Sequence, residues 1–196
     1  IQKNYDEAAK YGEKAVELGP NNAEAHALFG FILIYAGRAL EAIGLIKKAM
    51  RFQPDYLAWY AVYLGIAYTI TQEYSLALSA FKEVIVKAPH QTWGFSWSAI
   101  VYMRLGQKEK AIRQIKKALE LDPESSDVHV VLGQLNQIVH GDQKSAIIHF
   151  KQAHTINPND FYIKLWLGLS LCYVGKTEEA HSLWKIILQT DPLIPI

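Results

Sequence analysis

Histidines and a lone cysteine are the side chains of this sequence best suited to bind a metal ion or to act as a nucleophile. Three histidines, His140, His149 and His154, lie close together along the chain. A metal ion shared on one helix face needs ligands three or four residues apart, whereas His149 and His154 are five apart and point to different faces. We therefore expect surface or structural histidines, no metal and no cofactor.

The other reactive groups also favour a structural interpretation. Cys172 lies in an apolar stretch with no activating base evident, so we expect a buried, inert thiol rather than a nucleophile. Glu178 and Glu179 stand at an expected helix start, where carboxylates complement the helix dipole. The sequence has neither a glycine-rich phosphate loop nor a His-Glu-x-x-His motif. We predict that the chain is not an enzyme and that any catalytic domain lies outside it.

The composition is that of an ordered chain, with 51% hydrophobic and 20% charged residues. A net charge of +1 creates no field that would attract nucleic acid, so nucleic acid is not an expected partner. The longest apolar run, residues 28–37, is too short for a membrane span, which needs roughly 20 residues. The single cysteine and the absence of a signal-peptide layout favour a cytoplasmic location.

Three residue types recur along the chain with one period of 34 or 35 residues. Proline cannot continue a helix, so it marks the end of one, and small residues mark places where two helices cross closely. The first series is Pro20, Pro54, Pro89, Pro123, Pro158 and Pro192. The second, twelve residues before each proline, is Ala8, Ala42, Ala77, Ala111, Ala146 and Ala180. The third is Gly30, Gly65, Ala99, Gly133 and Gly168.

The rest of each period completes a pair of helices. Large side chains such as Phe81, Phe150 and Trp184 follow the alanine by four residues and would fill the seam between the two helices. Stretches such as "YAGRAL" and "VGKTEE" read as short helix–helix turns. This pattern resembles the tetratricopeptide repeat (TPR) family along the whole chain. The resemblance implies an all-α fold, a right-handed superhelical solenoid of about eleven antiparallel helices.

The resemblance also implies one continuous repeat domain. Residues 1–22 would supply the second helix of a truncated repeat. The full repeats would cover 23–56, 57–91, 92–125, 126–160 and 161–196, the last with its tail. Solenoid ends need polar caps, and neither end has one. We therefore expect a fragment of a longer chain, or ends that pack on other molecules, for instance in a homo-oligomer.

In this family the first helix of each repeat lines a concave groove, and helical geometry then identifies the groove positions. These positions are rich in aromatic and aliphatic residues. The expected partner-binding groove comprises Leu28, Phe31, Tyr35, Trp59, Tyr63, Ile66, Trp93, Trp97, Ile100, Arg104, Gln134, Tyr162, Trp166 and Tyr173. About half of this stripe should be buried between neighbouring repeats. The remainder predicts an apolar trough, since Trp and Tyr are typical interface anchors.

Three functions fit these features. The first is a protein-interaction scaffold that holds a hydrophobic peptide or helix, or a segment of its own full-length chain, in the groove. The second is a regulatory or oligomerising module of a larger enzyme, because residues 23–68 are similar to repeat segments attached to bacterial class III nucleotide cyclases. The third is capture of an apolar small molecule.

Overall fold

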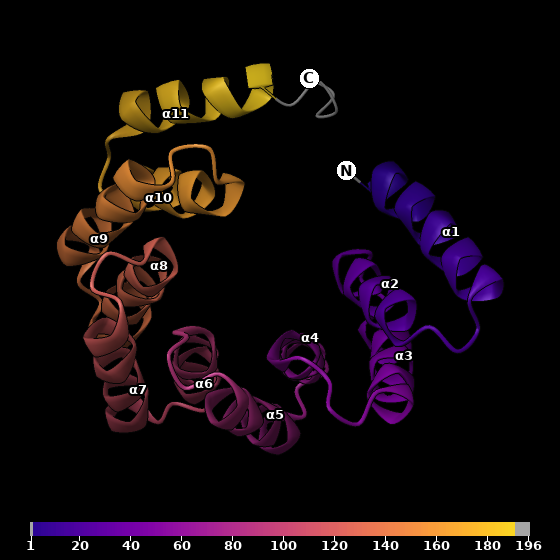
Figure 1. The fold of residues 1–196 in the computed structure, drawn as a ribbon. Helices are drawn as coiled ribbons and strands as arrows, with labels where there is room; N and C mark the ends of the chain where they lie inside the picture. The colour runs from indigo at the N-terminus through magenta and orange to yellow at the C-terminus, as the bar shows by residue number, and fades with distance from the viewer. Residues whose placement is uncertain (1, 191–196) are drawn as a thin grey trace. The chain divides into compact units, whose positions relative to one another are not determined.

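The computed structural model describes residues 2–190, and the side chains of residues 5–185. Within this range the chain forms eleven α-helices and one short π-helix, with no strand (Figure 1). The helices are α1 (Gln2–Leu18), α2 (Ala23–Tyr35), α3 (Ala39–Phe52), α4 (Ala58–Ile70), α5 (Tyr74–Lys87), α6 (Trp93–Arg104), α7 (Lys108–Leu121), α8 (Ser126–Leu135), α9 (Gln143–Ile156), α10 (Phe161–Tyr173) and α11 (Thr177–Thr190). The prediction of an all-α chain of eleven helices is confirmed.

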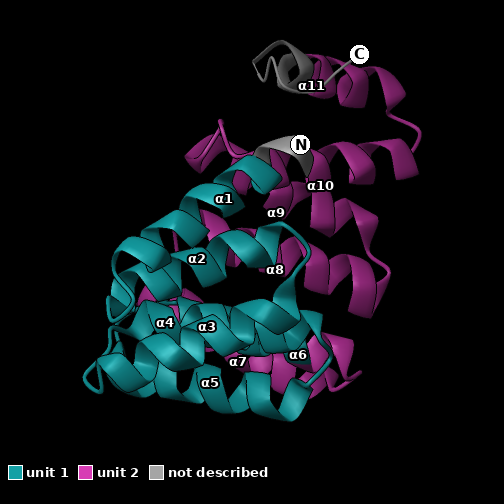
Figure 2. Ribbon diagram, turned by 90° about the vertical axis from the view of Figure 1, so that its right-hand side faces the viewer, with its two compact units in different colours: residues 1–101 teal, residues 102–196 magenta. Residues whose placement is uncertain are grey.

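The chain divides into two compact units, which Figure 2 distinguishes by colour. Unit 1 comprises residues 1–101 and unit 2 residues 102–196, so the boundary falls inside α6. The core of unit 1 is built around large buried side chains such as Ile46, Tyr60 and Phe81. In unit 2, Phe150 and Leu167 occupy the centre of a second buried cluster.

In four hairpins a glycine on the first helix faces a large residue on the second, in the pairs Gly30 and Ile46, Gly65 and Phe81, Gly133 and Phe150, and Gly168 and Trp184. A methyl group added to Gly65 would overlap the ring of Phe81, and one added to Gly133 would overlap the ring of Phe150. Both rings are completely buried. The small and large residues of the repeat thus meet at the seam between the helices, where van der Waals contacts of a rigid ring determine how closely the helices approach.

In several hairpins the first helix is followed by a residue whose backbone is in the left-handed conformation, with a positive φ. Gly37, Gly106 and Gly175 have φ values of 77°, 69° and 80°, which place them in the region that glycine tolerates best. The N–H that follows each of them donates to a carbonyl five residues back, as in a Schellman motif. In the hairpin of α4 and α5 this position is occupied by Gln72, whose φ is 63°.

Replacing Gln72 by glycine should therefore raise the free energy of unfolding by about 0.5–1 kcal/mol, because an L side chain is strained in the left-handed region. The reciprocal change Gly106→Gln should lower the free energy of unfolding by a similar amount. Both positions are exposed, so packing should not obscure the comparison. Urea unfolding of the two variants provides the measurement, and a shift in the same direction for both would contradict the expectation.

The hairpin of α8 and α9 contains one residue more than the others between its two small residues, Gly133 and Ala146. The last turn of the first helix accommodates this residue by widening into the π-helix η1 (Asn136–His140). Gly141, with φ 66°, ends the turn, and the N–H of Asp142 donates to Asn136 O at 2.9 Å. The hairpin therefore retains the short connection of the other repeats.

Candidate protein-interaction surface

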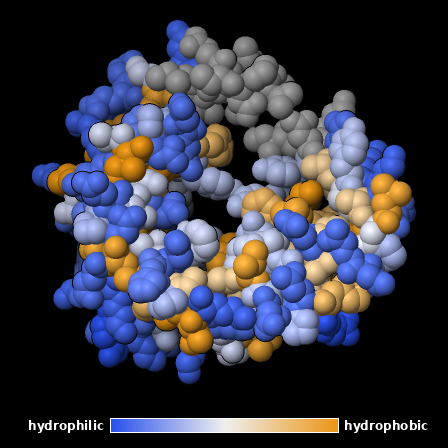
Figure 3. Space-filling view, viewed as in Figure 1, coloured by the Kyte–Doolittle hydropathy of each residue, from blue (hydrophilic) through white to orange (hydrophobic). Residues whose placement is uncertain are grey.

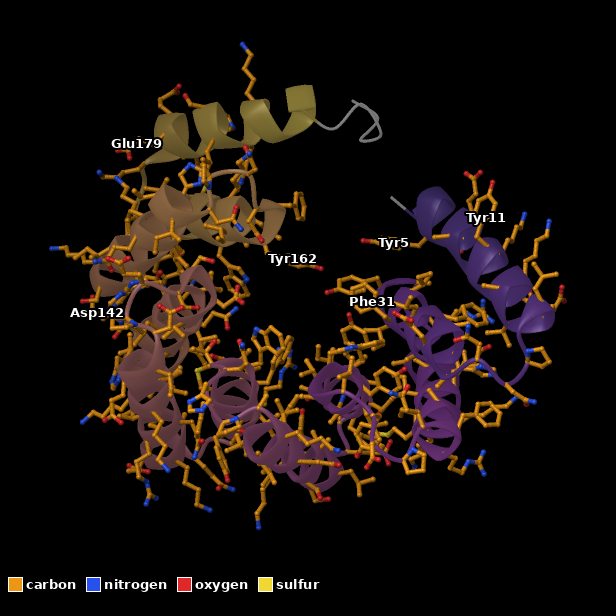
Figure 4. All side chains as sticks on the ribbon, in the orientation of Figure 1. Tyr5, Tyr11, Phe31, Asp142, Tyr162 and Glu179 are labelled. Carbon is orange, nitrogen blue, oxygen red and sulfur yellow. The ribbon has the colours of Figure 1, made fainter. Side chains whose placement is uncertain are left out.

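A series of aromatic rings in unit 1, which we call the unit 1 ring strip, runs from α1 across α2 to α4. Tyr5 stacks on Tyr35 with 6.1 Å between ring centroids, and Tyr35 meets the ring of Phe31 edge-on at 4.9 Å. Phe31 stacks on Tyr63 at 4.4 Å, and the Tyr63 centroid lies 5.2 Å from that of Trp59. Figure 4 shows Tyr5 and Phe31 projecting toward the same side of unit 1. Ring contacts at these distances are favourable, so the five residues form one continuous surface.

Exposure varies along the unit 1 ring strip. Phe31 and Tyr63 are half-buried, as expected for rings that fill the space between the first helices of adjacent repeats. Tyr35 remains 39% exposed at the end of α2. Leu28 on the same helix is also exposed, and Ile66 on α4 is half-buried. The strip therefore combines inter-repeat packing with apolar surface that remains accessible.

The tryptophans of α6 differ from each other. Trp93, in the first turn, is 39% exposed. Trp97 is half-buried and stacks on Phe81 of the preceding hairpin, with 6.0 Å between centroids and 15° between planes. Ile100 is half-buried one turn further on. Of these three predicted groove residues, Trp93 is the one whose replacement tests binding without removing a core contact.

In unit 2 the predicted aromatic groove residues lie along one stripe of α10. Tyr162 is 53% exposed and Tyr173 is 74% exposed, and Leu169 between them is exposed as well. Trp166 is half-buried and stacks on Phe150 at 6.1 Å with 16° between planes. The spacing of these residues places them on one helix face. We call Tyr162, Trp166, Leu169 and Tyr173 the α10 stripe.

Few polar groups accompany these apolar side chains. Arg104, in the last turn of α6, is exposed, and Gln134 on α8 is half-buried. Burial raises the pKa of the Tyr63 phenol, so its hydroxyl stays protonated and can donate a hydrogen bond. Charged residues concentrate on second helices such as α7, over which Figure 3 shows a predominantly hydrophilic surface. The first helices therefore offer chiefly apolar area.

One contributor to these surfaces was not among the residues expected from the sequence. Tyr5 lies in the expected truncated repeat, where no first helix was available to define groove positions. Leu169, by contrast, lies at a groove position of the expected fifth repeat, four residues before Tyr173, and is exposed.

The residues that could do chemistry do not assemble into a site. His140 is exposed at the end of η1, whereas His149 stacks on His129. In the described part of the chain no three metal-binding side chains gather as a metal ion would require. Cys172 is half-buried, and Glu179 pairs with lysine ammonium groups.

No helix among the described residues is both long and apolar enough to cross a membrane.

Stacked hairpins with a glycine–aromatic seam define a helical-repeat protein. Family models described as "Tetratricopeptide repeat" match residues 1–63 and residues 94–125. These matches and the solved TPR structures support the tetratricopeptide repeat family, as the sequence pattern predicted. The fold of this family is in general that of a non-catalytic scaffold for protein–protein interaction.

Similar proteins come from several organisms. The human antiviral innate immune response effector IFIT1 is 24% identical over an alignment of 220 residues, which includes 98% of this chain and 46% of IFIT1. BBSome complex member BBS4 of Bos taurus is 24% identical over 182 residues, which include 91% of this chain and 32% of BBS4. The chain thus spans less than half the length of these curated relatives.

Solved structures share the fold. TTC0263, a thermophilic TPR protein of Thermus thermophilus, superposes with a TM-score of 0.76 at 20% identity and covers 87% of this chain and 92% of its own. A structure described as the human IFIT1 dimer with m7Gppp-AAAA superposes with a TM-score of 0.72 at 23% identity, covering 95% of this chain and 46% of that one. The resemblance of residues 23–68 to repeats attached to bacterial nucleotide cyclases stays a prediction.

Proposed function

We propose that the chain is an interaction scaffold whose first helices bind an apolar segment of a protein partner. The observation that supports this proposal is the unit 1 ring strip, which forms a continuous aromatic surface across three helices. Its outer member Tyr35, together with Trp93, presents aromatic area to solvent. Large rings lose little conformational entropy on binding and gain much buried area, which is why they anchor interfaces.

The chemistry of this surface favours a peptide with apolar anchors over a charged one. Acidic and basic side chains are almost absent from the first helices of unit 1, where Glu24 is the one charge in α2 and α4 has none. An acidic or basic peptide would lose hydration without gaining an ion pair. An amphipathic helix or an extended apolar segment loses only water that is poorly bound to the rings.

Binding by this surface can be tested with a peptide selected from a random-sequence display library on the wild-type chain. The selected peptide, labelled with a fluorophore, is titrated against Tyr35→Ala and Trp93→Ala variants. We expect each variant to bind at least about tenfold more weakly, or about 1.4 kcal/mol, because each removes an exposed aromatic anchor. Circular dichroism should show unchanged helix content for both variants.

Tyr11→Ala is the matched control, because Tyr11 is an exposed tyrosine of α1 and is 68% exposed. Its removal should leave peptide affinity unchanged. If all three variants bind as the wild type does, the proposed surface is wrong.

A short single-stranded RNA provides the competing arm of the same experiment, because the IFIT1 structure contains m7Gppp-AAAA. We expect weaker binding of RNA than of the selected peptide. Arg104 is the single cation among the predicted groove residues, and nucleic-acid affinity depends on neutralised phosphates. Tighter binding of the RNA, lost as salt is raised, would overturn the protein-partner proposal in favour of a nucleic-acid scaffold.

A further inference from the structure

The hairpin of α8 and α9 contains three histidines, His129, His149 and His154, and at the positions of the last two the other hairpins have mostly apolar residues. Counting from the small residues of the repeat, the counterparts of His154 are Met50, Ile85 and Leu119. The counterparts of His149 are Leu45, Ala80, Gln114 and Leu183. The counterparts of His129 are His26, Ala61, Phe95 and Lys164. The His149 and His154 positions therefore have titratable rings where the other repeats have mostly hydrocarbon, whereas the His129 position also has a titratable side chain in two other repeats.

His129 on α8 and His149 on α9 face each other across the hairpin. Their rings stack with 5.6 Å between centroids and 20° between planes. Nδ1 of His129 is buried and has no hydrogen-bond partner, and Nδ1 of His149 lies 3.1 Å from Gln152 Oε1. Two imidazolium rings in this arrangement would repel each other, so the stack is stable only while at least one ring is neutral.

Few groups around His129 would favour its protonated form. Burial, followed by the neighbouring His149, lowers the pKa of His129. A hydrogen bond with the Pro123 backbone and the carboxylate of Asp122, both in the connection from α7, oppose this effect but do not reverse it. The net environment therefore favours the neutral form of the His129 ring.

A second histidine of the hairpin faces the next repeat. His154, in the last turn of α9, has its Nδ1 buried and without a partner. The charged group that acts on it is Lys164 of α10, a lysine that is only 5% exposed. Burial and then this ammonium group lower the pKa of His154. A proton on His154 would therefore add positive charge beside an existing buried cation.

We propose that the α8–α9 hairpin is a proton-sensitive element, which is stable while His129 and His154 are neutral and loosens from its neighbours when they take up protons. The two histidines lie at different contacts, one within the hairpin and one against α10. Protonation would thus weaken both the pairing of α8 with α9 and the packing of α9 on α10. Acidification alone, without any ligand, would therefore make this repeat less well packed.

The direction in which pH changes the stability of the hairpin follows from the linkage between proton binding and folding. Because the native pKa of each histidine is lowered, the unfolded chain binds protons that the native hairpin does not. Stability is full above the unfolded pKa of about 6.5 and is lost as the pH falls from there toward the native pKa. Within that window the folding constant should fall by up to about tenfold per pH unit for each histidine that stays neutral in the native state.

The test compares the wild type with a His129→Phe/His154→Leu variant, whose new residues occupy the same repeat positions in Phe95 and Leu119. Urea unfolding and amide hydrogen exchange are measured at pH 7.5 and 5.5. For the wild type we expect faster exchange of residues 126–173 at the lower pH, after correction for the intrinsic rate. In the variant this acceleration should disappear. A His90→Gln/His181→Gln variant, in which two exposed histidines are removed, should behave as the wild type does.

Proton NMR titration of the wild-type histidine rings keeps the proposal falsifiable if the double variant does not fold. Resonances of His129 and His154, assigned from single variants, should titrate below pH 6.5. Titration of both rings at or above that value would overturn the proposal. An unchanged pH dependence of exchange in the folded double variant would do so as well.

Discussion

Replacement of Phe150 by alanine should lower the free energy of unfolding of the hairpins around it by about 3–5 kcal/mol. The Phe150 ring is completely buried, faces Gly133 at the seam of its own hairpin, and stacks on Trp166 of the next. Truncation therefore removes contacts on two sides. Glycine cannot fill the space, and a cavity lined by Trp166 and Leu167 would remain.

The effect of Phe150→Ala should be local, because a repeat contacts chiefly its neighbours in the sequence. Hydrogen exchange should accelerate in α8, α9 and α10, while α2 to α4 keep their protection. Ile148→Ala is the matched control, since Ile148 lies on the same helix but is exposed, and it should change stability by less than about 0.5 kcal/mol. Equal effects of the two substitutions would contradict the assignment of Phe150 to the core.

The hairpins and their seams could be predicted from the sequence because the interactions that define them are local. Gly65 and Phe81, for example, lie within one period of the chain, and their types already specify a close crossing filled by a ring. The turn residue is equally local: glycine recurs at Gly37, Gly106 and Gly175 because the Schellman geometry needs a left-handed residue there. Gln72, which departs from this preference, adopts the same backbone because the two helices on either side determine it.

The exposure of the aromatic residues could not be predicted in the same way. Trp93 and Trp97 lie on one stripe of α6, yet Trp97 stacks on Phe81 while Trp93 faces solvent. Trp166 repeats the arrangement of Trp97 by stacking on Phe150 with almost the same geometry. These contacts join residues of adjacent repeats, and the packing of one repeat on the next is not determined by the period alone.

This division between stacked and exposed rings bears on the proposed function. Trp97 and Trp166 contribute to the contacts that hold successive hairpins together, so their replacement would alter stability as well as any binding. The exposed members, Tyr35 and Trp93 in unit 1 and Tyr162 and Tyr173 in unit 2, are the residues on which the proposed binding would depend. If partners bind here, rings that are held by the core beneath them would lose little freedom on binding.

The substitution Gly65→Ala should lower the free energy of unfolding by about 1–3 kcal/mol, although alanine is the better helix former. A methyl group at this position would overlap several atoms of the Phe81 ring. That ring is completely buried and stacked on Trp97, so it cannot move aside without disturbing the next hairpin. Gly44→Ala is the control. Apart from the nearby backbone of α3 itself, nothing lies within 4 Å of a methyl group added to Gly44, and its replacement should stabilise the chain by about 0.5–1 kcal/mol.

The chain itself suggests the substitution that should relieve the clash. At the equivalent sequence positions, the repeat of residues 92–125 has alanine, Ala99, and isoleucine rather than phenylalanine, Ile115. The double substitution Gly65→Ala/Phe81→Ile recreates this pair, so it should be less destabilising than the sum of the two single substitutions by at least about 1 kcal/mol. Urea unfolding of all four chains completes the cycle. If the changes in the free energy of unfolding are additive, the close approach of the two helices does not depend on matching the small residue to the large one. Size matching could then not explain why small and large residues recur at these positions in the repeats.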